Sequence, residues 1–198
     1  MSRTESTMLA LGTPAPDFSL PDVAHNRLVT LAELRGARPL LVMFISRHCP
    51  FVMHVAGELA RIDRDYGERV AMVGISSNDV EGYPDDAPDR MAAMARDFGY
   101  RFPVLGDGSQ DVARAYAAAC TPDFFLFDAD RRLVYRGQLD ASRPGNGIPV
   151  TGSDLRSALD AVLAGESVRA EQLPSMGCNI KWKPGNAPAH FAGRPRAG

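Results

Sequence analysis

One apolar segment followed by an abrupt change of pattern constrains this chain most. Residues 39–45 read Pro-Leu-Leu-Val-Met-Phe-Ile without a polar interruption, which is typical of a strand buried on both faces of a sheet. From Pro50 onward the apolar residues recur at helical spacing, and proline is favoured in the first turn of a helix. The sequence therefore predicts a buried strand over 39–45 that leads directly into a helix over 50–65.

Cys49 falls at the N-terminus of that predicted helix. Unpaired N–H groups and the positive end of the helix dipole stabilise an anion there, which favours loss of the thiol proton. Arg47 and His48 can add positive charge beside it. The alternative interpretation is a small apolar cysteine that caps a buried strand. A zinc site is disfavoured, because His48, Cys49 and His54 lack the spacing of zinc ligands and no paired C-x-x-C exists.

Composition narrows the class of protein. The 198 residues, 45% of them apolar, suffice for one domain with an ordinary core. The net charge of -2 favours neither a nucleic-acid partner nor an anionic membrane surface. No apolar run reaches the roughly 18 residues of a membrane span, and residues 1–11 lack the apolar core of a secretory signal. Three widely spaced cysteines fit a reducing compartment, so we expect a cytoplasmic protein.

The rest of the chain alternates between strand and helix patterns. A second buried strand is predicted over 70–75, and a strand–helix–strand unit with short links is parallel and right-handed. The acidic residues between 76 and 89 lack the order of a calcium loop and are interpreted as a solvated loop and helix start. Further predicted elements are a helix ending at Gly99, a strand at 102–105, a helix over 111–119, antiparallel strands at 124–127 and 133–135, and a last helix that Ser153 caps and Gly165 ends. This order predicts an α/β fold with a central mixed β-sheet flanked by helices.

Three segments together resemble a known family. They are Gly12-x-x-Ala-Pro-Asp-Phe-x-Leu20, then Ser46-x-x-Cys49-Pro50, and finally Thr121-Pro122 ahead of the strand at 124–127. The combination is similar to the thioredoxin superfamily and, within it, to the peroxiredoxin branch (alkyl hydroperoxide reductase and thiol-specific antioxidant group). The resemblance runs from about Gly12 to Gly165. It implies a thioredoxin-like fold with a peroxiredoxin-type N-terminal extension.

The resemblance also implies roles for individual residues. Cys49 would be the peroxidatic cysteine, with Arg47 or His48 lowering its pKa and the Ser46 hydroxyl bonding the peroxide or the thiolate. Thr121 and a cis Pro122 would face Cys49.

The chain departs from the family pattern at several positions. Ser46 excludes a C-x-x-C disulfide, and Val42 stands where peroxiredoxins keep a proline. The arginine that the family places near the strand at 123–127 is absent, and the candidates to replace it are Arg47, Arg136 and Arg143.

The C-terminal segment resembles the tail of a little-characterised peroxiredoxin-like subgroup. We expect a disordered N-terminus over 1–11, a redoxin domain over 12–167 and a tail over 168–198. Apolar residues should hold the tail against the domain; they are Ile180, Trp182 and Phe191. If the chain contains a resolving thiol, Cys120 is the first choice because it lies two residues before Pro122, and Cys178 in the tail is the second.

Three functional hypotheses follow. The first is a thiol peroxidase that reduces hydroperoxides through Cys49, with an external thioredoxin- or glutaredoxin-like reductant. The second is a thiol-disulfide oxidoreductase, and the third is a redox-sensing protein with weak or lost catalysis. None requires a metal or an organic cofactor. A homodimer is compatible with the resemblance, because redoxin domains often dimerise.

Overall fold

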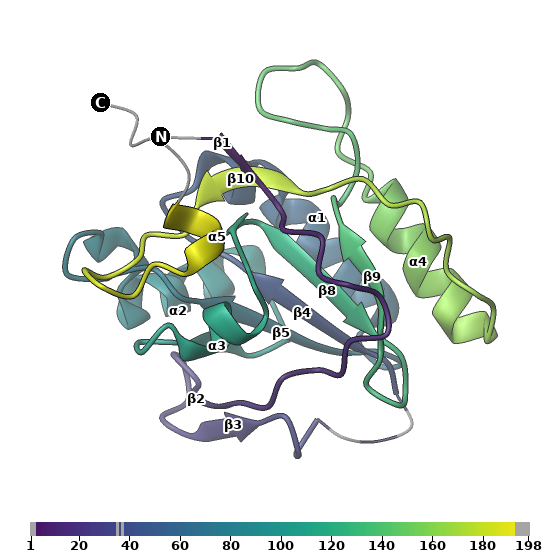
Figure 1. Cartoon of the computed structure of the whole chain (residues 1–198), viewed down its shortest axis with the longest axis horizontal. Coiled ribbons are helices and arrows are strands. Elements are labelled where there is room, and N and C mark those ends of the chain that lie inside the picture. Colours follow the sequence, from purple (N-terminus) through teal and green to yellow (C-terminus); the bar gives the residue numbers. More distant parts are fainter. Residues whose placement is uncertain (1–2, 35, 37, 193–198) are drawn as a thin grey trace.

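The fold is built on a five-stranded sheet with the strand order β6-β5-β4-β8-β9 (Figure 1). The computed structural model describes residues 3–34, 36 and 38–192, so the remaining residues of the expected N-terminus and tail (1–2 and 193–198) lie outside it. The strands are β4 (Leu40–Phe44), β5 (Ala71–Ser76), β6 (Val104–Gly106), β8 (Asp123–Phe127) and β9 (Leu133–Gly137). The first three are parallel, whereas β8 is antiparallel to β4 and β9 to β8. The predicted mixed sheet is confirmed.

Structure covers both faces of this sheet. Three helices pack on one face, namely α1 (Pro50–Tyr66), α2 (Pro88–Phe98) and α4 (Ser153–Ala164). The other face carries α3 (Asp111–Ala115) and the hairpin of β2 (Ser19–Pro21) and β3 (Leu28–Thr30). Short helices lie at η1 (Pro84–Asp86) and α5 (Ala189–Ala192). Among the described residues, no helix is long and apolar enough to cross a membrane.

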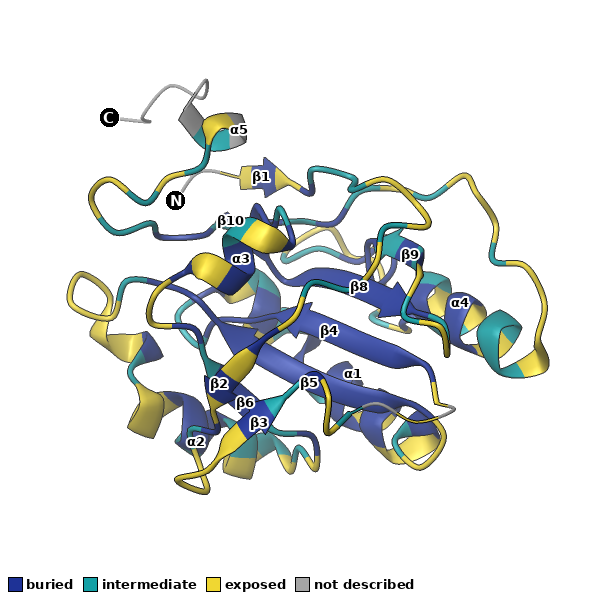
Figure 2. Ribbon diagram, turned by 60° about the horizontal axis from the view of Figure 1, so that its bottom comes forward, coloured by how far each residue is buried: buried dark blue, intermediate teal, exposed yellow. Residues whose placement is uncertain are grey.

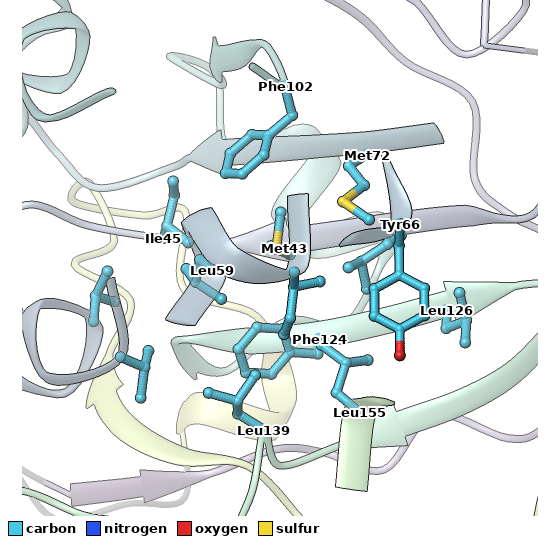
Figure 3. Close-up of a cluster of buried hydrophobic side chains, with 14 of the residues drawn as sticks. Met43, Ile45, Leu59, Tyr66, Met72, Phe102, Phe124, Leu126, Leu139 and Leu155 are labelled. Atoms are coloured by element: carbon cyan, nitrogen blue, oxygen red, sulfur yellow. The ribbon is translucent and has the colours of Figure 1, made fainter. Parts of the chain in front are cut away.

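The double coverage explains the unbroken apolar run that precedes Cys49. Every residue of β4 and β8 is buried, as the dark blue strands in Figure 2 show. Met43 and Phe124 pack in one buried cluster with Leu59 of α1, as Figure 3 shows. Phe44 and Phe125 face the opposite side and pack edge-to-face, with ring centroids 5.8 Å apart. Alternate side chains thus fill two cores, so neither face of the strand can be polar.

Two predicted helix boundaries are corrected. The helix expected over 111–119 ends at Ala115, and Ala117 takes a left-handed φ of 49° where the chain turns into β7 (Cys120–Thr121). The last helix is preceded by Gly152 (φ 69°) rather than capped by the Ser153 side chain. The predicted helix ends at Gly99 and Gly165 are confirmed, and both glycines are left-handed.

The two ends of the chain form a second small sheet with the order β1-β10-β7. It pairs β1 (Arg3–Glu5) and β7 with the two edges of β10 (Met176–Asn179), all antiparallel. Residues 3–6 of the expected disordered N-terminus are ordered instead, because β10 and Ser175 give them backbone partners. The expected docking of the tail is confirmed for β10 and for Ile180, whose side chain is buried.

Candidate active site

Cys49 is the last residue of the short segment that joins β4 to α1, as its sequence context predicts. It is the N-cap residue of α1, with extended backbone, and Pro50 opens the helix. Its thiol is completely buried and donates to the Thr121 carbonyl oxygen at 3.1 Å. The Thr121–Pro122 bond is cis, as the resemblance implies. The structure thus brings Cys49, Thr121 and Pro122 together across 72 residues of sequence.

The tail supplies a second thiol at the same place. In the β10–β7 ladder Cys178 is paired with Thr121, the residue whose carbonyl contacts Cys49. The Cys178 and Cys49 side chains are hydrogen-bonded to each other. Backbone N–H groups of the first turn of α1 reach both sulfurs, Val52 that of Cys49 and Phe51 that of Cys178. The site is therefore a buried pair of thiols at a helix N-terminus.

This geometry separates the acidities of the two thiols. The hydrogen bond from Cys178 lowers the pKa of Cys49 to about 6, despite burial, with further support from Thr121 and the Val52 N–H. The same hydrogen bond and burial raise the pKa of Cys178. The expectation of a low-pKa thiol at Cys49 is thus supported, and Cys49 is the more acidic thiol of the pair.

Cys120 occupies a different position from the one that sequence favours. It is fully buried, and its thiol contacts the Pro122 carbonyl oxygen at 3.6 Å. In the β10–β7 ladder it is paired with Asn179, one residue along from the Cys178–Thr121 pair. Since successive strand residues point to opposite faces, Cys120 faces away from the side on which Cys178 meets Cys49. The structure therefore brings Cys178 next to Cys49 and turns Cys120 to the other side of the strand.

The residues between β4 and Cys49 also behave differently from expectation. Ser46 is buried and donates to the carboxylate of Asp86 (2.9 and 3.1 Å) instead of presenting its hydroxyl to a substrate. The His48 ring bonds the same carboxylate through Nδ1 at 2.6 Å, and Arg47 pairs with Asp85 at 3.7 Å. Carboxylates therefore bind both side chains, and hydrogen bonds from other groups lower the pKa of Cys49 in their place.

Asp86 is the main residue that sequence analysis missed. It belongs to the acidic loop interpreted as solvated, yet it is only 2% exposed. Burial disfavours its charge, but hydrogen bonds from His48, Asn78 and Ser46 outweigh burial and hold its pKa below the ordinary value. Nothing within the loop distinguishes it from its exposed neighbour Asp85. Its donors come from segments 8 to 40 residues away, so no local signal marks it.

Tyr83 and Lys181 lie next to the His48 side of the site. The Tyr83 ring stacks on His48, with centroids 5.2 Å apart, and the Lys181 ammonium lies 5.6 Å from the same ring. Burial lowers the pKa of Lys181, while negative charge on Cys178, Cys49 and Asp86 opposes that shift. Lys181 is therefore a cation within electrostatic reach of the two thiols.

The three arginines proposed to replace the family's arginine have other partners. Arg136 binds the Leu9 carbonyl and Gln172, and Arg143 binds the Gln138 side chain and nearby carbonyls. Arg47 is held by Asp85. Lys181 interacts electrostatically with both thiols, and its ammonium donates to the carbonyl and side-chain oxygens of Asn179 at 2.8 and 3.0 Å.

A buried cysteine of lowered pKa at a helix start, facing a cis-proline turn on a mixed sheet, defines a thiol-dependent redox protein with a thioredoxin-like fold. The match of residues 11–136 to the model of the AhpC/TSA family supports this class directly. The chain belongs to the AhpC/TSA family.

Similar proteins cover most of the chain. A crystal structure described as an uncharacterized conserved protein from Geobacillus kaustophilus is 52% identical, with a TM-score of 0.91 over 93% of this chain and 98% of that one. A "Putative peroxiredoxin" of Mycobacterium tuberculosis is 29% identical over 58% of this chain and 68% of its own length. A "Thiol:disulfide interchange protein DsbE" of Allochromatium vinosum is 30% identical over 65% of this chain and 67% of its own length.

Proposed function

We propose that this protein is a thiol peroxidase in which Cys49 attacks a hydroperoxide and Cys178 resolves the product. The observation that carries the proposal is the hydrogen bond between the two thiols at the start of α1. It makes Cys49 the more acidic thiol and holds a second sulfur next to it. Membership of the AhpC/TSA family supports the same assignment.

The proposed reaction has two steps within the chain. The Cys49 thiolate attacks one oxygen of the hydroperoxide and the O–O bond breaks, so that Cys49 becomes a sulfenic acid. The alkoxide that leaves takes up a proton from the solvent and becomes the alcohol. The sulfur of Cys178 then attacks the sulfenic sulfur, water leaves, and a Cys49–Cys178 disulfide forms. An external dithiol returns both cysteines to the thiol state by exchange and is itself oxidised.

Burial of Cys49 favours a small oxidant. Its side chain has no exposed surface, and the tail strand β10 covers it. A hydroperoxide needs a smaller opening than a protein disulfide, which must bring a whole chain to the sulfur. This scheme does not require a hydroxyl from Ser46. We assign to Lys181, which interacts electrostatically with both thiols, the role of offsetting the developing negative charge.

A second candidate function is thiol-disulfide exchange with a protein partner. The observation in its favour is that Cys49 and Cys178 already form a dithiol, the chemical unit such exchange uses. It differs from the peroxidase in requiring β10 to move before a large substrate can reach Cys49.

Rapid mixing of the reduced protein with one equivalent of hydrogen peroxide, followed by disulfide mapping by peptide mass, tests the proposal. We expect peroxide consumption and a 49–178 link, both lost in Cys49→Ser, and an overoxidised or persistent sulfenic Cys49 in Cys178→Ser. Cys120→Ser is the matched control and should retain the link. Reduction of a protein disulfide at a rate exceeding peroxide turnover would favour the second candidate instead.

A further inference from the structure

A single buried carboxylate holds the segment that leads into Cys49. Asp86 accepts hydrogen bonds from the Arg47 N–H at 2.6 Å, the His48 N–H at 3.3 Å, the Ser46 hydroxyl and the His48 ring. These donors belong to the three consecutive residues that precede Cys49. Because they include two backbone N–H groups, Asp86 fixes the path of the chain into α1 as well as the side chains.

The same carboxylate is linked to the tail through one amide side chain. Asn78 donates from Nδ2 to Asp86 at 2.7 Å and accepts at Oδ1 from the Lys181 N–H at 2.8 Å. The Asp79 N–H also donates to the Lys181 carbonyl at 2.8 Å. Lys181 is three residues beyond Cys178. A chain of hydrogen bonds therefore joins the segment that carries Cys49 to the segment that carries Cys178.

Burying a carboxylate is unfavourable unless hydrogen bonds compensate it, and such a network is satisfied in only one arrangement. Formation of η1 does not by itself require a buried carboxylate, because the neighbouring Asp85 in the same short helix is exposed. The buried position of Asp86 is used instead to hold two distant segments in fixed relation.

We propose that Asp86 is a positioning residue for the thiol pair, which acts through the 46–48 segment and, by way of Asn78, through the tail. This inference rests on the proposed roles of Cys49 and Cys178. Asp86 contacts neither thiol in the hydrogen bonds described above. Its effect is to raise the effective concentration of one sulfur at the other, which sets how readily their disulfide forms.

The test measures the equilibrium between the Cys49–Cys178 disulfide and dithiothreitol in the full chain carrying Cys120→Ser, at a temperature where circular dichroism shows every variant folded. We expect Asp86→Asn and Asn78→Ala each to lower the proportion of disulfide, with an equilibrium constant changed by at least about tenfold. Asp63→Asn is the matched control, because Asp63 is also buried and binds the Arg101 N–H, but from the far end of α1.

The outcomes separate the inference from the proposed function. If the parent protein forms no 49–178 disulfide, the proposed function fails. If the parent forms it and both Asp86→Asn and Asn78→Ala retain its equilibrium constant, the positioning role is overturned. A purely structural role for Asp86 would lower the unfolding temperature of the variants without changing that constant. Should Asp86→Asn not fold, Asn78→Ala alone decides the question, since it cuts the link to the tail and leaves the carboxylate with its donors from the 46–48 segment.

Discussion

Gly177 and Thr121 approach so closely that a Cβ on residue 177 would lie 1.9 Å from the Thr121 carbonyl oxygen. No side chain fits there, and the obstructing atoms are backbone atoms that cannot turn away. Glycine at this position therefore allows β10 to lie against the turn at Pro122. The next residue in the chain, Cys178, is thereby held beside Cys49.

Gly177→Ala is expected to push the tail away from Thr121. Overpacking against backbone should destabilise the fold by about 2–3 kcal/mol and slow formation of the 49–178 disulfide. Denaturant unfolding and disulfide mapping measure the two effects. Gly57→Ala in α1 is the control, because that site is open and alanine favours a helix by up to about 1 kcal/mol. An unperturbed Gly177→Ala protein would show that the tail does not dock as described.

Removing the Cys178 thiol should make Cys49 less acidic. The hydrogen bond from Cys178 is the largest influence that lowers the pKa of Cys49, to about 6. In Cys178→Ala the pH midpoint for ionisation of the Cys49 thiol should rise toward the ordinary thiol value of about 8.5. Thiolate absorbance at 240 nm, followed against pH with Cys120 replaced by alanine, reports the midpoint. Cys49→Ala in the same background should abolish the low transition, and an unchanged midpoint in Cys178→Ala would contradict the assigned hydrogen bond.

Asp123 should make the stability of the protein depend on pH. It is fully buried beside Pro122 and accepts from Ser6 at 2.7 Å, and burial raises its pKa from 3.8 to about 7. Since the folded-state pKa lies above the unfolded value, its contribution to stability is complete below about pH 3.8 and is lost as pH rises through about 7.

Asp123→Asn should therefore gain stability relative to the parent as pH rises from 4 to 8, by up to about 4 kcal/mol. Urea unfolding across that range measures the difference. Asp140→Asn is the control for replacing a buried carboxylate with its isostere, because Asp140 binds backbone N–H groups elsewhere. A difference between Asp123→Asn and the parent that is constant across pH would refute the raised pKa.

Ser46→Ala should affect stability more than chemistry. Loss of its hydrogen bond to the Asp86 carboxylate should destabilise the fold by about 1.5–3 kcal/mol, the range for a bond to a charged group. The pH midpoint of Cys49 should move less than in Cys178→Ala, because Ser46 is not among the groups that set it. A hundredfold loss of peroxide reactivity at unchanged stability would instead restore the role that sequence resemblance implies, direct contact with the peroxide.

The sequence by itself determined the part of the site that depends on short-range causes. The apolar run before Cys49 requires a doubly covered strand, and Pro50 requires the helix to begin there, so the thiol had to lie at a helix start. Family resemblance added Thr121 and the cis bond at Pro122. The strand and the helix start follow from the order of neighbouring residues, which any correct fold must respect, whereas Thr121 and the cis bond came from the resemblance alone.

Only the tertiary structure decided which groups act on that thiol. The sequence favours Cys120 over Cys178 as a partner thiol, but a register fixed by strand pairing brings Cys178 to Cys49 and turns Cys120 away. Asp86 looks like its solvated neighbours until donors from two separate segments, residues 46–48 and Asn78, surround it. The physical reason is the same in both cases: the free energy of a buried thiol or carboxylate depends on partners distant in the chain, and no local pattern records them.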